Sequence, residues 1–132
     1  MKKAILVFGA GILQESLIRR AQGMGLFVVG IDPCEEAYCR DVVDVFEVVG
    51  GQDFEGTIAV AKKYNVSAIV TTATDKPLVM MARVAKELGL RFFSEETAIV
   101  STDKFLMKER FMASGIPCAK GKVVSTEEEA SD

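Results

Sequence analysis

The sequence has 132 residues, of which 49% are hydrophobic and 27% are charged, the balance of a globular domain with its own core. Sixteen basic and nineteen acidic residues give a net charge of −3 and form no basic block, which argues against nucleic acid as a partner. The chain contains no histidine, which excludes Ser-His-Asp and Cys-His hydrolases, histidine-ligated zinc sites and histidine acid–base catalysis.

Localisation and redox state follow from the apolar segments and the cysteines. No apolar segment approaches the roughly 20 residues that a membrane span needs. The apolar segment after the basic start contains Gly9 and Gly11 and lacks a small-residue cleavage site, unlike a signal peptide. We therefore expect a cytoplasmic protein with no membrane partner. Reduced thiols of open role, rather than a zinc site or disulfides, are expected at Cys34, Cys39 and Cys118.

Strand and helix patterns alternate along the chain. Buried strands are predicted at residues 4–8, 26–31, 45–49 and 68–72, with a short fifth strand at 91–93. Apolar residues recur at helical spacing within 13–24, 54–61 and 78–88. Glycines followed by an apolar residue are predicted to end three helices, at Gly25, Gly89 and Gly115. The alternation predicts an α/β fold, a small Rossmann-like doubly wound parallel sheet.

A glycine loop follows the first predicted strand and is the first candidate binding site. It contains Gly9, Gly11, Ile12, Leu13 and Gln14. Glycines at this point permit a tight strand-to-helix turn, and the next helix N-terminus offers N–H groups to an anion. A dinucleotide-binding domain would also place a ribose-binding acid where Asp32 stands. The third glycine of that fingerprint is replaced by Gln14, so the motif leaves the NAD(P)-binding alternative open.

The loop after the fourth predicted strand is the second candidate. Thr74 or Asp75 is predicted to cap the following helix, with Pro77 in its first turn. The alternative is a functional one, because open α/β sheets bind ligands at the carboxyl ends of their strands. This loop and the glycine loop would then flank one crevice.

The third motif is the helix predicted within residues 101–117. Its charged residues indicate a helix with a solvated outer face, and its Gly-Ile-Pro sequence predicts the end of that helix. Lys104 lies in the first turn, where the helix dipole disfavours a cation. This position suggests that Lys104 is kept for a partner.

At this motif the sequence resembles the junction between the first two domains of ATP-grasp ligases, which include biotin carboxylase and the carbamoyl-phosphate synthase large subunit. The junction resemblance rests on Asp103-Lys104, Met107-Lys108, Phe111 and Gly115-Ile116-Pro117. Further resemblance covers nearly the whole chain: Gly9-Ala10-Gly11 and Asp32-Pro33 are similar to the opening strands, and Asp41, Asp44, Phe46 and Val48 to the third-strand region.

The resemblance implies a pre-ATP-grasp substrate-side domain over residues 1–100, and a junction helix with the truncated start of the ATP-grasp module over 101–132. It implies that ATP and Mg²⁺ phosphorylate a small carboxylate substrate in the complete enzyme, and that an amine attacks the acyl phosphate. It implies that Lys104 reaches the ATP phosphates, for which a flexible lysine is suited. Too few residues follow Pro117 to build the nucleotide-binding module, so we expect this chain alone to be inactive and to hold neither ATP nor metal.

The same resemblance implies that the acid substrate is bound by Gly9, Gly11, Ile12, Leu13, Gln14, Thr74 and Asp75; catalytic residues stay unassigned. Some purine-pathway relatives carry a polar residue where this chain has Ile12, which speaks against a ribonucleotide and favours a carbamoyl-phosphate-synthase-like or amino-acid ligase. The missing module is expected in cis or as a separate subunit, and a homodimer is one expected assembly. A stand-alone NAD(P)-binding domain and a regulatory or interaction module are the alternatives.

The end of the chain contains a capping-box pattern at Ser125–Glu129, which predicts the start of a last helix. The alternative for this segment is a solvated acidic tail.

Overall fold

The computed structural model describes residues 1–131, and its centre is a four-stranded parallel sheet in the order β3-β2-β1-β4. The strands are β1 (Ala4–Phe8), β2 (Phe27–Asp32), β3 (Val45–Val48) and β4 (Ala68–Val70). Register is fixed by parallel pairs such as Leu6 with Val29 and with Ile69. Every residue of β1 is buried, as expected for a central strand covered on both faces. The predicted α/β fold and its four main strands are confirmed.

The helices in chain order are the 3-10 helix Ile12–Gln14, α1 (Glu15–Gly23), α2 (Phe54–Lys63), α3 (Leu78–Leu88), α4 (Glu95–Thr102), α5 (Lys104–Ala113) and α6 (Glu127–Ser131). None of these helices in residues 1–131 has the length and apolarity to cross a membrane.

Two hydrophobic cores lie on opposite faces of the sheet, which makes it doubly wound. On one face, Leu6 and Val29 pack with the buried sides of α2 and α3, including Ile58 and Met81. On the other face, alternate strand residues such as Val28 pack with α1 and with the loop before β3. Because neighbouring residues of a strand point to opposite faces, both cores draw on the same strands.

The three predicted glycine helix ends are confirmed by the backbone. Gly25, Gly89 and Gly115 have φ angles of 80°, 64° and 67°, the left-handed region that residues with a Cβ avoid. Gly30 serves another purpose, since a Cβ there would lie 2.8 Å from Cγ1 of Val43. That contact lets the loop before β3 pack closely over β2.

Two details of the sequence prediction were wrong or incomplete, and a third is not tested. Among the described residues, 91–93 form no strand and pair with no strand of the sheet; Phe92 packs against the core between the sheet, α2 and α3, and the segment leads into α4. Helix α4 was not predicted; Ser94 caps it by accepting a hydrogen bond from Thr97 N at 3.1 Å. The predicted domain boundary between residues 100 and 101 falls inside α4, and the division stays a prediction.

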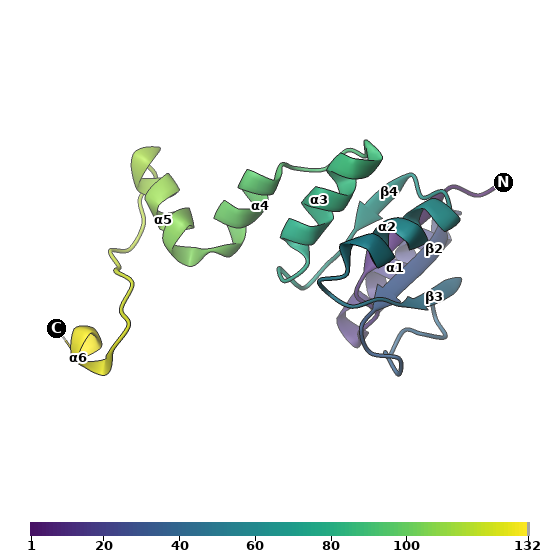
Figure 1. Cartoon of the computed structure of the whole chain (residues 1–132), viewed down its shortest axis with the longest axis horizontal. Coiled ribbons are helices and arrows are strands. Elements are labelled where there is room, and N and C mark those ends of the chain that lie inside the picture. Colours follow the sequence, from purple (N-terminus) through teal and green to yellow (C-terminus); the bar gives the residue numbers. More distant parts are fainter. Residues whose placement is uncertain (132) are drawn as a thin grey trace.

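Helices α4, α5 and α6 form an arm that leads away from the sheet (Figure 1). Ion pairs join its first parts: Arg83 of α3 with Glu95 at 2.7 Å, and Glu96 with Arg110 of α5 at 2.9 Å. An extended segment then leads to α6, where Thr126 Oγ1 accepts from Glu129 N at 3.2 Å. The predicted last helix is therefore present.

Candidate functional site

A cavity of about 380 Å³ lies at the carboxyl edge of the sheet, between the glycine loop, the loop after β3 and the loop after β4. Its apolar lining comes from Phe8, Ile31, Pro33, Val49, Pro77 and Met80. Its polar side chains are Gln14, Asp32, Gln52, Thr57, Thr74 and Lys76, with backbone from Gly9, Gly11, Gly50 and Gly51. This is the edge at which open α/β sheets bind ligands, and its size suits a small molecule.

Two backbone N–H groups of the glycine loop, those of Ala10 and Gly11, are already bonded to side chains of the protein. Ala10 N donates to Asp32 Oδ2 at 2.9 Å, and Gly11 N donates to Gln14 Oε1 at 3.0 Å. The other carboxylate oxygen of Asp32 accepts from Cys34 N at 2.9 Å. A dinucleotide-binding loop would offer such amides to a pyrophosphate. The geometry therefore disfavours that use of the loop.

Gln14 joins the two loops that flank the cavity. Its side chain is only 6% exposed, and its Nε2 donates to the Thr72 carbonyl, beyond β4, at 2.8 Å. A Cβ on Gly11 would lie 3.1 Å from Gln14 Oε1, so a larger residue there would require the Gln14 amide to shift by a few tenths of an ångström. Both ends of the Gln14 amide are thus used within the protein, a role that the fingerprint comparison did not reveal.

Cys39 holds the glycine loop in place through two hydrogen bonds to its backbone. Its N donates to the Ala10 carbonyl at 2.7 Å, and its Sγ donates to the Gly11 carbonyl at 3.2 Å. Burial raises the pKa of the Cys39 thiol, the Glu15 carboxylate raises it further, and Arg19 opposes both. A buried neutral thiol is a poor nucleophile, so Cys39 is a packing residue.

Of the two residues predicted to bind substrate in the loop after β4, Thr74 and Asp75, only one lies at the cavity. Thr74 lines the cavity, whereas Asp75 is exposed and lies outside the lining. Neither side chain caps α3: the N-cap is Pro77, and the turn is closed by Leu78 N donating to the Asp75 carbonyl at 3.2 Å. The predicted cap is wrong because Lys76 and Pro77 lie between Asp75 and the first helical residue.

Two further residues of the predicted substrate set point away from the cavity. Ile12 and Leu13 are 61% and 64% exposed and do not belong to the lining. The 3-10 turn that contains them turns Gln14 inward and leaves the other two side chains outside. The structure thus brings Gly9, Gly11, Gln14 and Thr74 together, and separates them from Ile12, Leu13 and Asp75.

Sequence reasoning missed Lys76 and the loop Gly50-Gly51-Gln52. The signal for the loop was available, because paired glycines followed a predicted strand that ends at the same edge as β1. The signal for Lys76 was weaker, since it follows the two residues that had been singled out as caps.

Lys104, the expected phosphate contact, is the first residue of α5 and is exposed. Asp103 caps this helix: its Oδ1 accepts from Phe105 N at 2.9 Å and from Leu106 N at 3.0 Å. Lys104 is not part of the cavity lining. Within residues 1–131 no group of three His, Cys, Asp or Glu side chains is arranged to hold a metal ion.

Comparison with solved structures defines the class of fold. Phosphoribosylglycinamide synthetase from Anaerococcus prevotii superimposes with a TM-score of 0.78 and 27% identity over 99% of this chain and 34% of its own. N5-carboxyaminoimidazole ribonucleotide synthetase from Thermotoga maritima superimposes with a TM-score of 0.78 and 25% identity, over 97% of this chain and 35% of that protein. L-amino acid ligase from Bacillus licheniformis shares the fold at a TM-score of 0.69 and 12% identity, over 88% and 31%.

The chain has the fold of the N-terminal domain of ATP-grasp ligases, as the sequence resemblance implied. It spans about a third of the length of the solved structures that it matches. Neither a protein-family model nor a curated protein matches the sequence.

Proposed function

We propose that this chain is the substrate-side domain of an ATP-dependent carboxylate–amine ligase that works through an acyl phosphate. The observation that carries the proposal is the cavity at the carboxyl edge of the sheet, in a chain with the fold of the N-terminal domain of such ligases. The solved relatives include carboxylate–amine ligases, which supports a ligase reaction. The cavity would bind the acid, and the rest of the reaction would need groups outside residues 1–131.

The chemistry proceeds in two steps. A carboxylate oxygen attacks the γ-phosphorus of ATP and displaces ADP, which forms the acyl phosphate. The amine then attacks the acyl carbon, and phosphate leaves with that carboxylate oxygen. Negative charge must be offset in the first step, and cations near the phosphates do so. Lys104 is the residue of this chain to which we assign such a contact, because it is an exposed cation at the start of α5.

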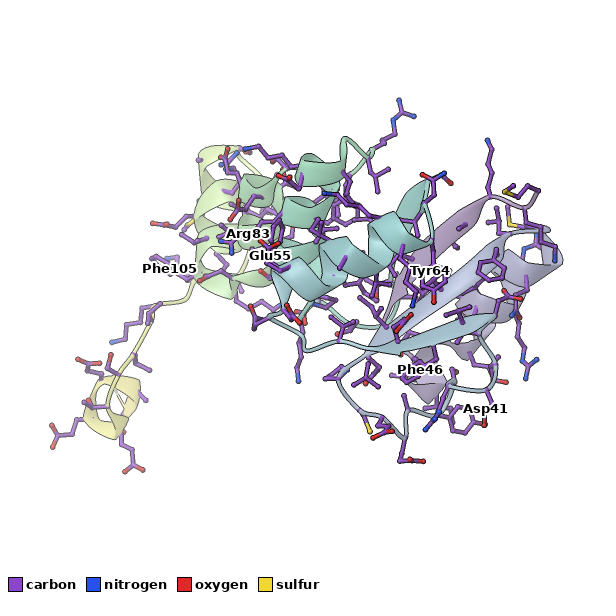
Figure 2. The ribbon with its side chains drawn as sticks, turned by 45° about the vertical axis from the view of Figure 1, so that its right-hand side comes forward. Asp41, Phe46, Glu55, Tyr64, Arg83 and Phe105 are labelled. Carbon is purple, nitrogen blue, oxygen red and sulfur yellow. The ribbon has the colours of Figure 1, made fainter. Side chains whose placement is uncertain are left out.

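The partner that we propose is an ATP-grasp module, in cis or as a separate subunit. Helix α5 has no buried residue, and its exposed apolar side chains include Phe105 and Met112, followed by Ile116. Phe105 lies on the helical arm, far from Asp41 in the sheet region (Figure 2). Several exposed apolar side chains on one short segment favour an interaction surface. A module packed on α5 would bring its nucleotide close to Lys104.

Among carboxylate–amine ligases we favour a carbamoyl-phosphate-synthase-like or amino-acid ligase over one that acts on a ribonucleotide. A phosphorylated ligand needs several donors for its phosphate. In this site Ala10 N and Gly11 N are committed to Asp32 and Gln14. The same hydrogen bonds disfavour the NAD(P)-binding alternative, which requires binding of NAD(H) at millimolar concentration.

The test uses the native assembly that contains this chain, purified with an antibody against residues 1–131. With MgATP, pooled carboxylic acids and amines, we expect ADP release that depends on the acid. Lys104→Ala should weaken ATP use about tenfold or more, since it removes a charged contact with phosphate. Lys62→Ala, at an exposed lysine of α2, is the matched control and should leave ATP use unchanged. Full ATP use in Lys104→Ala would refute the role of Lys104, and saturable NAD(H) binding without acid-dependent ADP release would refute the ligase proposal.

A further inference from the structure

The charges that face the cavity restrict the substrate that it can bind. Among the described residues, its lining contains two charged side chains, Asp32 and Lys76. Both oxygens of Asp32 accept backbone N–H groups, from Ala10 and Cys34. Lys76 forms no ion pair with another described residue, and it is exposed, directly before the N-cap residue of α3. Lys76 is therefore the one lining cation with its charge available to a ligand.

The start of α3 adds to the positive potential at the same side of the cavity. This helix has 11 residues, and no side chain caps its N-terminus. Pro77 and Met80, from its N-cap and first turn, line the cavity beside Lys76. A helix N-terminus carries about half a positive charge, which favours an anion nearby. Lys76 and the helix end thus attract a negative group to one side of the cavity.

The rest of the cavity is suited to an apolar body. Phe8 and Ile31 end their strands there, and Val49 and Met80 close the adjoining walls. Two of its uncharged polar side chains are used within the protein: Gln14 uses both ends of its amide, and the Thr57 hydroxyl donates to the Asp53 carbonyl at 2.7 Å. Gln52 and Thr74 are the other uncharged polar side chains of the lining. A bound ligand would therefore bury its apolar surface over these walls.

A phosphate monoester does not match these charges. It carries about −1.5 to −2 at neutral pH, and it is recognised best by arginine or by several donors. The lining contains no arginine, has a single lysine and includes the negative Asp32. Because Asp32 and Lys76 already offset each other, a bound carboxylate leaves one net negative charge in the lining, and a phosphate monoester leaves more. The lining therefore favours the carboxylate.

We propose that Lys76 is the specificity-determining residue of this site and that it holds the single carboxylate of a substrate whose remaining body is apolar. The inference rests on the proposed function for its role in catalysis, but the binding itself requires only this chain. Lys76 acts here by selecting the charge and position of the acid before its carboxylate meets the nucleotide.

The test compares three probes with the same body, hexanoate, hexyl phosphate and hexanol, by NMR titration of the full chain. Hexanoate should shift backbone signals of the three loops around the cavity and bind more tightly than the other two. Lys76→Met should weaken hexanoate binding about tenfold, as expected for loss of one charge-assisted contact. Lys62→Met is the matched control, because Lys62 is exposed on α2 and outside the lining.

Tighter binding of hexyl phosphate than of hexanoate would overturn the inference, and so would unchanged hexanoate binding in Lys76→Met. Absence of hexanoate binding to the unaltered chain would overturn it as well. These results are separate from the ligase proposal, since no nucleotide is present. Lys76-dependent binding together with no acid-dependent ADP release would leave the inference standing and refute the ligase, whereas an active ligase with an unchanged KM for its acid in Lys76→Met would do the reverse.

Discussion

Different interactions stabilise the sheet region, which consists of β1–β4 with α1, α2 and α3, and the helical arm, which consists of α4, α5 and α6. In the sheet region, two cores bury both faces of β1, and the loops at its carboxyl edge are tied by hydrogen bonds through Gln14 and Asp32. In the arm, α5 and α6 contain no buried residue, and surface ion pairs link α4 to its neighbours. Surface ion pairs contribute little. Packing thus holds the sheet region and its candidate cavity in place, whereas the arm leaves apolar side chains exposed, where we propose that a partner binds.

The largest difference is expected from the same substitution placed in the two regions. Leu6 is completely buried in β1, and Leu6→Ala should lower the free energy of unfolding by about 3 kcal/mol or more through lost burial and a cavity. Leu106→Ala, on α5, should cost less than about 1 kcal/mol because that helix buries no residue. Urea denaturation of both variants measures the difference. Equal losses would show that the arm is part of the same core.

The next effect concerns the connection between the two cavity loops. Gln14→Ala leaves Gly11 N and the Thr72 carbonyl without their partner and should cost about 2 kcal/mol. Gln52→Ala changes another glutamine of the lining, which is exposed, and should cost less than about 0.5 kcal/mol. Denaturation with urea again gives both values. If the two variants were equally stable, Gln14 would not connect the loops.

Thiol reactivity should also separate the regions. Cys39 is fully buried, so a thiol reagent should modify it only on unfolding, while Cys118, after α5, should react in the folded protein. Burial raises the pKa of Cys39 above its ordinary value of 9.0. As the pH rises, the Cys39 thiol therefore loses its proton in the unfolded chain before it does so in the folded protein. The contribution of the neutral thiol to the free energy of unfolding should be complete below pH 9.0 and should be lost as the pH rises through the folded pKa. Cys39→Ala should abolish this decline in urea titrations at alkaline pH; an unchanged decline would contradict the assignment.

The smallest effect compares two surface ion pairs. Lys63 and Tyr64 both donate to Glu47 Oε1 at 2.7 Å, and these hydrogen bonds hold the pKa of Glu47 below its ordinary 4.5. Glu47→Gln should cost about 0.5 kcal/mol at neutral pH, and the difference should vanish as the pH falls below 4.5 through the folded pKa.

Glu96 is the matched control for that pair. It meets Arg110 on the arm, where the two side chains are 77% and 58% exposed. Glu96→Gln should therefore change the free energy of unfolding at neutral pH by an amount close to zero. A loss as large as that of Glu47→Gln, measured by urea denaturation, would show that the arm is held as firmly as the sheet region.

Much of the fold could be predicted from the sequence because it depends on local patterns. The buried run at 4–8, the helical spacing at 78–88 and the glycine stops each determine structure within a few residues. Helix α4 was missed because residues 95–102 show almost no amphipathic pattern, with Ala98 as its one buried residue. The arrangement of the strands follows general rules of parallel sheets.

The site was less predictable because it depends on contacts across the sequence. The glycine loop could be placed at the correct edge, but the inward position of Gln14 depends on the carbonyl of Thr72, far along the chain. Ile12 and Leu13 could not be separated from Gln14 without knowing the 3-10 turn. Lys76 differs from the other lysines only in the cavity beside it, which the fold creates.

The most direct test of the account follows an oxygen atom of the acid through the reaction. The native assembly that contains this chain is supplied with MgATP, an amine and its acid substrate. Both carboxylate oxygens of the acid are a heavy isotope, and the phosphate released is examined by mass spectrometry. An acyl phosphate requires that the attacking carboxylate oxygen leave with the phosphate, so the account predicts one labelled oxygen in each phosphate released. Phosphate without the label would contradict the proposed reaction.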